Sequence, residues 1–286
     1  MKTKIIVLIL SILVPAVSHA VFIGAGTASS ANANNSQPAG DQGWSSMGVY
    51  NTGGAVYLKN GWFITAGHLG TSGGSVNYNS VDYSISKWTN ITNETGTSAD
   101  IRLFQVLNPS AFTGSGSSVY TNSMSIGTGV TMIGNGRDVS SVASTGLETR
   151  YYEGTVSQMK WGQNVISGHQ TGYSELGFVS DVYITTLNDG TAQALDKDSG
   201  GGVFFYDSGS DEYLLSGVII AATRYSDGNI YARTHKTLDN STTSFVDLSA
   251  YSEQINQAIP EPASAMLLIG VGALLGVAHR IRCMLE

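Results

Sequence analysis

Short apolar segments separated by clusters of Gly, Asn, Asp and Ser form the main pattern of the chain between residues 50 and 222. Each segment has the length of a β-strand, and turn-forming residues bound it. The segments are residues 54–58, 62–66, 101–107, 130–133, 179–185, 202–206 and 214–222. No regular alternation of strands with long helices accompanies them, which disfavours a parallel α/β fold. The pattern therefore predicts an all-β protein.

Three further segments are predicted from the same pattern. Between residues 247 and 258, Leu248, Tyr251, Ile255 and Ala258 recur on one face of a helix, the only helix the sequence predicts. Residues 206–213 indicate a hairpin loop, with a calcium site as the less favoured interpretation of its acidic side chains. Residues 25–46 are rich in small and polar residues, and we expect them to form an exposed lead-in.

The N-terminal 20 residues have the pattern of a secretory signal peptide. Lys2 and Lys4 precede an apolar stretch over residues 5–17, and Ser18-His19-Ala20 places small residues at both positions that determine cleavage. We expect cleavage before Val21. An uncleaved anchor helix is the alternative, although the apolar stretch is short for a membrane span.

The C-terminus carries Pro260-Glu261-Pro262, then apolar or small residues over 263–278, then a basic cluster with Arg280 and Arg282. The apolar stretch rises about 24 Å as a helix, short of the roughly 30 Å hydrocarbon core. By the positive-inside tendency the arginines remain cytoplasmic. In this order the three elements resemble the PEP-CTERM sorting signal of Gram-negative bacteria. That resemblance implies recognition by an exosortase and processing during export, whereas a plain C-terminal membrane anchor is the alternative.

Composition narrows the function classes. Only 12% of the residues are charged, and residues 21–259 hold ten basic and nineteen acidic side chains. This acidic body repels nucleic acid, so a nucleic-acid partner is not expected. The high glycine content, 35 residues, fits a turn-rich β protein. Cys283 is the only cysteine of the chain, so no intramolecular disulfide can form.

Three short motifs carry candidate chemistry. His68 follows the apolar stretch Trp62-Phe63-Ile64-Thr65-Ala66, so it emerges from a rigid strand at a loop. Ser199 is followed by Gly200-Gly201-Gly202, which lets the backbone turn tightly and leaves the hydroxyl uncovered. Asp100 opens an apolar strand between them, where a carboxylate can accept the Nδ1 proton of a histidine.

The order His68, Asp100, Ser199 in these contexts resembles the chymotrypsin-like serine proteases of trypsin fold, with motifs of the type Thr-Ala-Ala-His, Asp-Ile-x-Leu and Gly-Asp-Ser-Gly-Gly. The resemblance extends from about residue 50 to residue 259. It includes Gly53-Gly54-Ala55-Val56, Gly134-Asn135-Gly136, Gly217-Val218-Ile219 and the helix at 246–259. It implies two Greek-key antiparallel β-barrels and a C-terminal helix. The expected division is 1–20 signal peptide, 21–49 lead-in, 50–130 first barrel, 131–259 second barrel with the helix, and 260–286 sorting segment.

The resemblance also implies roles for single residues. Ser199 would be the nucleophile, His68 the general base and then acid, and Asp100 the group that orients His68. The backbone N–H groups of Lys197 and Ser199 would form the oxyanion hole. No metal or cofactor is expected.

Several positions depart from the family pattern. Lys197 stands where the family has glycine, and its side chain disfavours the backbone conformation of an oxyanion hole. At the expected specificity pocket the chain has Gln193, Ala221 and Asn229, so no preference for Arg or Lys substrates is implied. Ile220-Ala221-Ala222 replaces the segment that pairs with the substrate backbone. A non-catalytic binding or matrix protein on the same fold is therefore the alternative function.

Asp198 precedes the nucleophile, where the family carries an aspartate that pairs with a newly exposed α-amino group. Signal-peptide removal would expose Val21 and supply such a group; otherwise Asp198 bonds only the local backbone. His169 and His235 have no second ligand at metal spacing and are interpreted as structural.

Together these features predict an exported serine endopeptidase that acts on protein or peptide substrates through an acyl-enzyme. Its expected location is the cell surface or extracellular matrix, with a transient anchor in the inner membrane through the C-terminal segment.

Overall fold

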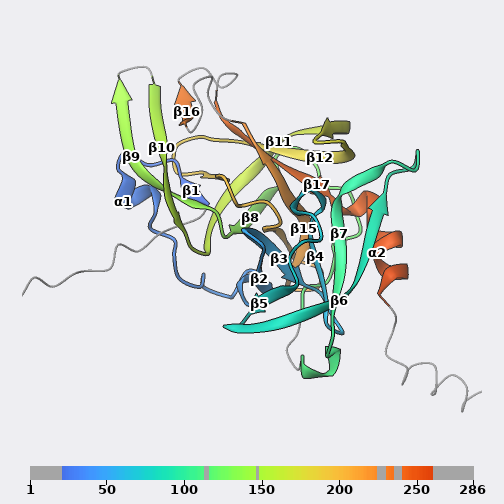
Figure 1. Cartoon of the computed structure of the whole chain (residues 1–286). Helices are drawn as coiled ribbons and strands as arrows, with labels where there is room; N and C mark the ends of the chain where they lie inside the picture. Colours follow the sequence, from blue (N-terminus) through green and yellow to red (C-terminus); the bar gives the residue numbers. More distant parts are fainter. Residues whose placement is uncertain (1–20, 113–115, 146–147, 224–229, 235–239, 260–286) are drawn as a thin grey trace, which may run out of the picture.

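Antiparallel pairing joins the seven predicted strands and several others into two closed barrels (Figure 1). The computed structural model describes residues 21–112, 116–145, 148–223, 230–234 and 240–259. The predicted segments 1–20 and 260–286 lie outside the described residues. No helix among the residues described is long and apolar enough to cross a membrane.

Each barrel contains six strands. The first is formed by β2 (Met47–Tyr50), β3 (Gly53–Tyr57), β4 (Trp62–Ala66), β5 (Ser75–Tyr78), β6 (Val81–Thr92) and β7 (Ser98–Val106). The second is formed by β8 (Gly129–Gly134), β11 (Lys160–Glu175), β12 (Phe178–Thr186), β14 (Gly202–Asp207), β15 (Glu212–Ala222) and β17 (Thr242–Asp247). Around the barrels the orders are β2-β3-β4-β7-β6-β5 and β8-β11-β12-β17-β15-β14. Both barrels therefore follow the same sequence of connections.

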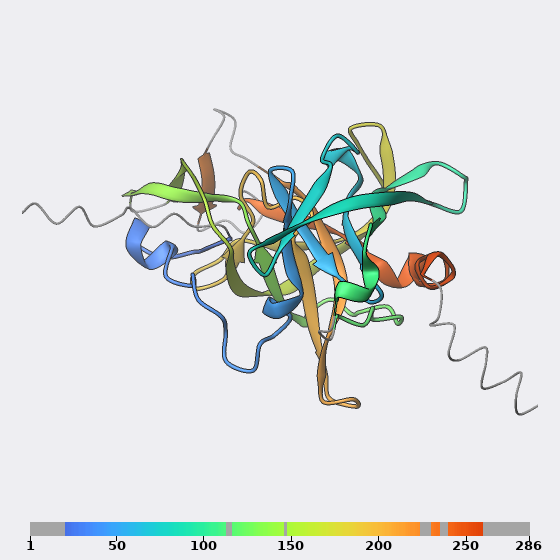
Figure 2. The ribbon, with the colours of Figure 1, turned by 60° about the horizontal axis from the view of Figure 1, so that its bottom comes forward.

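Smaller elements accompany the two barrels. A three-stranded sheet has the order β16-β10-β9, and a two-stranded one pairs β1 with β13. These strands are β1 (Phe22–Ile23), β9 (Arg137–Thr145), β10 (Glu148–Ser157), β13 (Ala192–Gln193) and β16 (Ile230–Thr234). The helical elements are α1 (Ala28–Ala31), η1 (Trp44–Ser46), η2 (Gly67–Leu69), η3 (Pro109–Ala111), η5 (Leu248–Tyr251) and α2 (Ser252–Ala258). The β14–β15 hairpin extends from the barrel as the expected loop (Figure 2).

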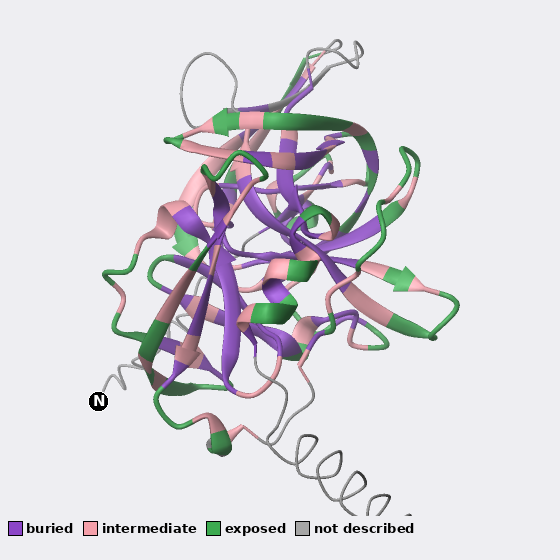
Figure 3. Ribbon diagram, turned by 90° about the vertical axis from the view of Figure 1, so that its right-hand side faces the viewer, coloured by how far each residue is buried: buried purple, intermediate pink, exposed green. Residues whose placement is uncertain are grey.

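Apolar burial explains why the barrels form and stay together. Buried strand segments run through the centre of the molecule, and the exposed residues gather at hairpin ends and outer edges (Figure 3). The first barrel has an aromatic core that includes Tyr50, Phe63 and Phe104. A further cluster combines Ile64 of the first barrel with Val218 of the second. The two barrels consequently share one continuous apolar interface in place of disulfides.

Two expectations differ from the structure. The predicted helix at 247–258 begins later, because residues Leu248–Tyr251 form a 3₁₀ turn whose cap, Asp247, accepts the Ser249 N–H. The lead-in is not exposed throughout: Asn32 is buried against β9, and Gln42 is buried against β8 of the second barrel. Asn32 exchanges two hydrogen bonds with the backbone of Val139, and the Gln42 amide oxygen accepts one from the Thr131 hydroxyl. These contacts could not be predicted from the polar composition of the lead-in, because they are made to strands that are distant in the sequence.

Candidate active site

His68 is held at the end of a fully buried strand. All five residues of β4 are buried, and the chain then turns through η2, which contains His68. The imidazole Nδ1 lies 2.7 Å from Asp100 Oδ2, and the backbone N–H of His68 donates to Asp100 Oδ1 at 2.8 Å. One carboxylate therefore fixes both the backbone and the ring of His68. This arrangement favours the tautomer with a proton on Nδ1 and leaves Nε2 available as a base.

Asp100 links the two barrels. It lies in β7 of the first barrel, is buried, and donates its backbone N–H to the Ser180 hydroxyl of β12 at 2.8 Å. The Asp100 carboxylate is thus positioned by contacts from both barrels. No sequence signal marks Ser180, because its contribution depends on how the barrels dock.

Ser199 lies in a loop pressed against β3. The Ser199 carbonyl accepts the Gly54 N–H at 2.8 Å, and the next residue, Gly200, has a φ of +82°. A Cβ on Gly200 would lie 2.0 Å from the Gly54 carbonyl oxygen and 2.5 Å from Thr65 Oγ1. Only glycine fits this approach of backbone to backbone. The glycines after Ser199 therefore set the position of its hydroxyl relative to the first barrel.

His68 and Ser199 line one cavity of about 430 Å³ between the barrels. Its other lining residues are Glu175, Leu176, Leu195, Asp196, Lys197, Ile219, Ile220, Ala221, Ala222 and Tyr231. Within the described residues no hydrogen bond joins His68 to Ser199. Such contacts are often long in a ligand-free site and tighten when substrate binds.

The predicted oxyanion donors are free to act. Among the residues that the structure describes, neither the Lys197 nor the Ser199 backbone N–H donates to a protein acceptor. Lys197 has a φ of +70°, the left-handed conformation that glycine adopts readily and that costs a side-chain-bearing residue about 1–2 kcal/mol. The chain thus adopts this conformation at Lys197 despite the side chain.

Asp198 is completely buried beneath the Ser199 loop. Its carboxylate accepts the backbone N–H groups of Leu195 at 2.7 Å, Gly136 at 2.7 Å and Val21 at 3.2 Å. Burial raises the pKa of Asp198 to about 6, against the effect of these hydrogen bonds and of the nearby Lys160 cation. The Val21 nitrogen lies next to Asp198, as expected if signal-peptide cleavage creates a terminus that pairs with this acid. Asp198 also bonds the local backbone, which is the alternative interpretation.

Lys160 is a buried lysine that the sequence does not single out. It begins β11, opposite Gly134 of β8, and its Nζ donates to Asn32 Oδ1 at 3.0 Å. A Cβ on Gly134 would meet the Asp198 carboxylate, so this pair of strands faces that acid. Burial lowers the pKa of Lys160 to about 7, while the charges of Asp198 and Asp138 act in the opposite direction.

The predicted specificity residues have separate locations. Ala221 lines the cavity. Gln193 is fully buried elsewhere, where its amide nitrogen donates to the carbonyls of Ala194 and Thr242, and it does not line this cavity. Asn229 lies outside the described residues.

His169 does not line the cavity that contains His68 and Ser199. His169 packs on Tyr183, with ring centroids 4.8 Å apart, and its Nε2 lies 3.6 Å from Asp247 Oδ2. His235 lies outside the described residues. The contacts of His169 are those of a structural side chain.

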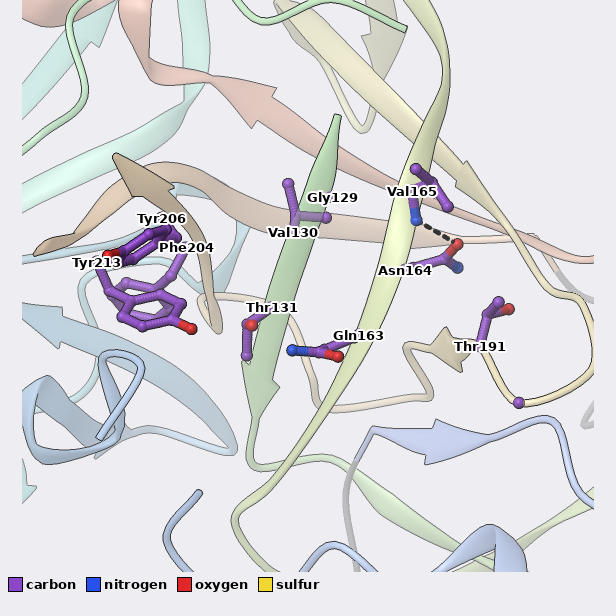
Figure 4. Close-up of a pocket in the computed structure, with 11 residues that line it drawn as sticks. Gly129, Val130, Thr131, Gln163, Asn164, Val165, Thr191, Phe204, Tyr206 and Tyr213 are labelled. Carbon is purple, nitrogen blue, oxygen red and sulfur yellow. Dashed lines mark hydrogen bonds between the residues drawn. The ribbon is translucent and has the colours of Figure 1, made fainter. Parts of the chain in front are cut away.

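A second cavity, of about 420 Å³, lies on the second barrel (Figure 4). Phe204, Tyr206 and Tyr213 line one part, and Gln163, Asn164 and Thr191 line another. The Asn164 amide oxygen accepts the Val165 N–H at 2.7 Å (Figure 4). Among the described residues that line this cavity there is no nucleophile beside a base, so the candidate active site is the cavity that contains His68 and Ser199.

Comparison with known families identifies the C-terminal segment. The PEP-CTERM protein-sorting motif matches residues 258–282. This motif is a sorting signal, which implies export to the cell surface and recognition by an exosortase. A comparison with curated proteins by sequence found no match.

Solved structures resemble the body of the chain. Mouse neuropsin, a serine protease expressed in the limbic system of the brain, superposes with a TM-score of 0.51 at 14% identity, over 72% of this chain and 88% of neuropsin. The inactive form of Rv3671c from M. tuberculosis gives a TM-score of 0.47 at 13% identity, over 80% and 95% of the two chains. The likeness to neuropsin establishes the trypsin-like fold. The predicted fold class of two antiparallel barrels with a short C-terminal helix is confirmed.

Proposed function

We propose that the protein is an exported serine endopeptidase in which Ser199, His68 and Asp100 hydrolyse peptide bonds. The observation that carries this proposal is the two-point contact of Asp100 with the backbone and ring of His68, beside Ser199 in one cavity. A histidine oriented by a buried carboxylate is the base that a serine hydroxyl needs, since the free hydroxyl is a weak nucleophile.

The reaction proceeds in two halves. Ser199 Oγ attacks the substrate carbonyl carbon while its proton passes to His68 Nε2, and Asp100 stabilises the resulting imidazolium. The negative oxygen of the tetrahedral intermediate accepts hydrogen bonds from the N–H groups of Lys197 and Ser199. His68 then returns the proton to the leaving amine and an acyl-enzyme forms. Water, deprotonated by His68, releases the second product and restores the Ser199 hydroxyl.

The substrate we propose is an extended peptide. The Ile219 backbone still bonds Gly200 and Gly201, but beyond it β15 no longer pairs on this side, and the following residues Ile220, Ala221 and Ala222 line the cavity. An extended chain can add to this free side of the strand through backbone hydrogen bonds. Binding through the peptide backbone depends little on which side chains the substrate carries. This agrees with the sequence, which implies no preference for Arg or Lys.

Labelling with a fluorophosphonate probe tests the proposal directly, because the probe reacts only with an activated serine. We expect the body from Val21 to Ile259 to be labelled, and both Ser199→Ala and His68→Ala to abolish labelling. Equal labelling of the three proteins would refute the proposed mechanism. Digestion of a peptide library with the same protein then gives the substrate preference.

A non-catalytic binding protein is the second candidate function. The lysine at position 197 and the altered residues at the expected specificity pocket favour it. In that case the cavity would bind a peptide without cleaving it. Hydrolysis of any peptide that depends on Ser199 would exclude this function.

A further inference from the structure

The turn between β11 and β12 carries an exposed leucine. Glu175 pairs with Phe178, so Leu176 and Gly177 form a two-residue hairpin turn. Their φ angles are +51° and +85°, both in the left-handed region. Leu176 is 70% exposed, more than any other large hydrophobic residue in the described part of the chain.

Leucine is disfavoured at this position for two independent reasons. Turns with positive φ at both central residues prefer Asn, Asp or Gly first, because a bulky side chain crowds its own backbone there. An apolar side chain at a hairpin tip also gains nothing from contact with water. Asparagine would adopt the left-handed backbone conformation readily, and its polar amide would be solvated by water. A residue that is unfavourable both for the backbone conformation and for contact with water indicates a function other than stabilising the fold.

The turn is located at the candidate active site. Leu176 and Glu175 line the cavity that contains His68 and Ser199. The turn is anchored there by Phe178, whose ring approaches to 3.0 Å the point where a Cβ on Gly67 would lie. Gly67 is the residue before His68, so the hairpin packs directly on the histidine motif.

Two hydrogen bonds within the hairpin make it rigid. The Tyr173 hydroxyl donates to the Glu175 carboxylate at 2.5 Å, and the Gly172 N–H donates to Asp181 Oδ1 at 2.9 Å. The Glu175 side chain is thereby bonded within the hairpin, whereas Leu176 has only apolar surface to offer. The part of the cavity at the turn is consequently suited to an apolar group.

We propose that Leu176 is a specificity-determining residue that contacts an apolar side chain of the bound peptide near the scissile bond. This inference rests on the proposed peptidase function. A peptide extended along the free side of β15 would cover Leu176 with one side chain, and burial of both apolar surfaces would favour Leu, Ile or Phe there. The left-handed turn holds the leucine in the cavity before substrate arrives, so little entropy is lost on binding.

The test uses Leu176→Asn, which suits the turn while it removes the apolar surface. A peptide library that varies each position around the cleaved bond is digested with wild type and variant. At one position we expect the variant to lose about tenfold in kcat/KM for Leu, Ile and Phe and less than twofold for Ala and Ser, the discrimination typical of one apolar contact. The thermal midpoint of unfolding should not fall, because asparagine fits the turn.

Leu107→Asn is the matched control, since Leu107 is 63% exposed and does not line this cavity. We expect its cleavage profile to equal that of wild type. Fluorophosphonate labelling of wild type and Leu176→Asn distinguishes the role of Leu176 from the peptidase activity itself. Equal labelling with an unchanged side-chain preference would overturn the role of Leu176 alone. A uniform loss over all peptides would overturn it too, and absence of labelling in wild type would overturn the peptidase proposal itself.

Discussion

At the scale of single residues, Asp198 and Lys160 are ionisable side chains that the fold removes from water. Neither exposes any surface, and burial shifts the two pKa values toward each other, to about 6 for Asp198 and about 7 for Lys160. Each neutral form is favoured by desolvation, and each charge is favoured by the other. Because Asp198 directly precedes Ser199, the charge state of this pair is linked to the loop that holds the proposed nucleophile.

The first prediction concerns pH and Lys160. Between pH 7 and about 10.5 the unfolded chain keeps the lysine proton that the folded protein has released, so the free energy of unfolding should rise with pH. The slope is at most about 1.4 kcal/mol per pH unit. Asp198 acts in the opposite sense between about pH 4 and 6, where the folded protein keeps a proton that the unfolded chain has lost.

Urea unfolding of wild type and Lys160→Met from pH 6.5 to 9.5 measures the lysine contribution. The wild-type free energy of unfolding minus that of the variant should increase with pH. Lys87→Met, at an exposed lysine, is the control and should leave the wild-type slope in place. A difference between wild type and Lys160→Met that is constant with pH would contradict the prediction.

A second residue-scale prediction concerns Asp100→Asn. The amide nitrogen of asparagine cannot accept the Nδ1 proton, so the ring would adopt the wrong tautomer and kcat should fall by about 10⁴-fold. The measurement is kcat on the best peptide from the library. Asp82→Asn replaces an exposed aspartate that bonds only Asn77 among the contacts the structure describes, and should leave kcat unchanged. A loss of less than tenfold in Asp100→Asn would argue against the orienting role.

At the scale of elements, strands and loops differ in how far sequence predicts them. Every residue of β4 is buried, so its apolar residues form a clear pattern, whereas only one residue of β6 is buried and its sequence lacks such a pattern. The motif residues His68, Asp100 and Ser199 are recognisable because each stands in a characteristic short sequence at a strand or a turn. Lys160, Ser180 and Leu176 carry no such signal, because their roles arise from strands that meet only in the folded protein.

The loop of Ser199 provides the prediction at this scale. Gly200→Ala would place a methyl group against the Gly54 carbonyl, in a backbone conformation that disfavours alanine. We expect the free energy of unfolding to fall by about 2–4 kcal/mol, from overpacking and left-handed strain together. Urea unfolding followed by circular dichroism measures this change. Gly74→Ala, where nothing lies within 4 Å, should change it by less than about 0.5 kcal/mol.

At the scale of the whole molecule, the beginning of the described chain is built into the second barrel. Val21 and Phe22 are fully buried, and β1 pairs with β13. The Val21 nitrogen that contacts Asp198 is an amide in the intact chain and would be an ammonium after cleavage before Val21. A positive charge there would favour ionised Asp198. Export and activation would then be a single event.

The corresponding prediction compares two mature forms. A protein that begins at Val21 should react with the fluorophosphonate probe, and one with a single alanine added before Val21 should react at least tenfold more slowly, because its charge no longer reaches Asp198. A Val21→Ile form with an unextended terminus is the control and should behave as wild type. Equal rates for the extended and unextended forms would mean that Lys160 alone compensates Asp198.

The hydrogen bond from the Asp100 backbone to Ser180 has a consequence for the folding pathway. His68 and Asp100 come from one barrel, Ser199 and the Ser180 anchor from the other, so a half-folded chain contains no complete site. During export, a chain with only one barrel formed would be unable to cleave itself or other proteins. Proteolytic competence would be the last property acquired, delayed until the halves have docked, and this would protect the secretion machinery from its own cargo.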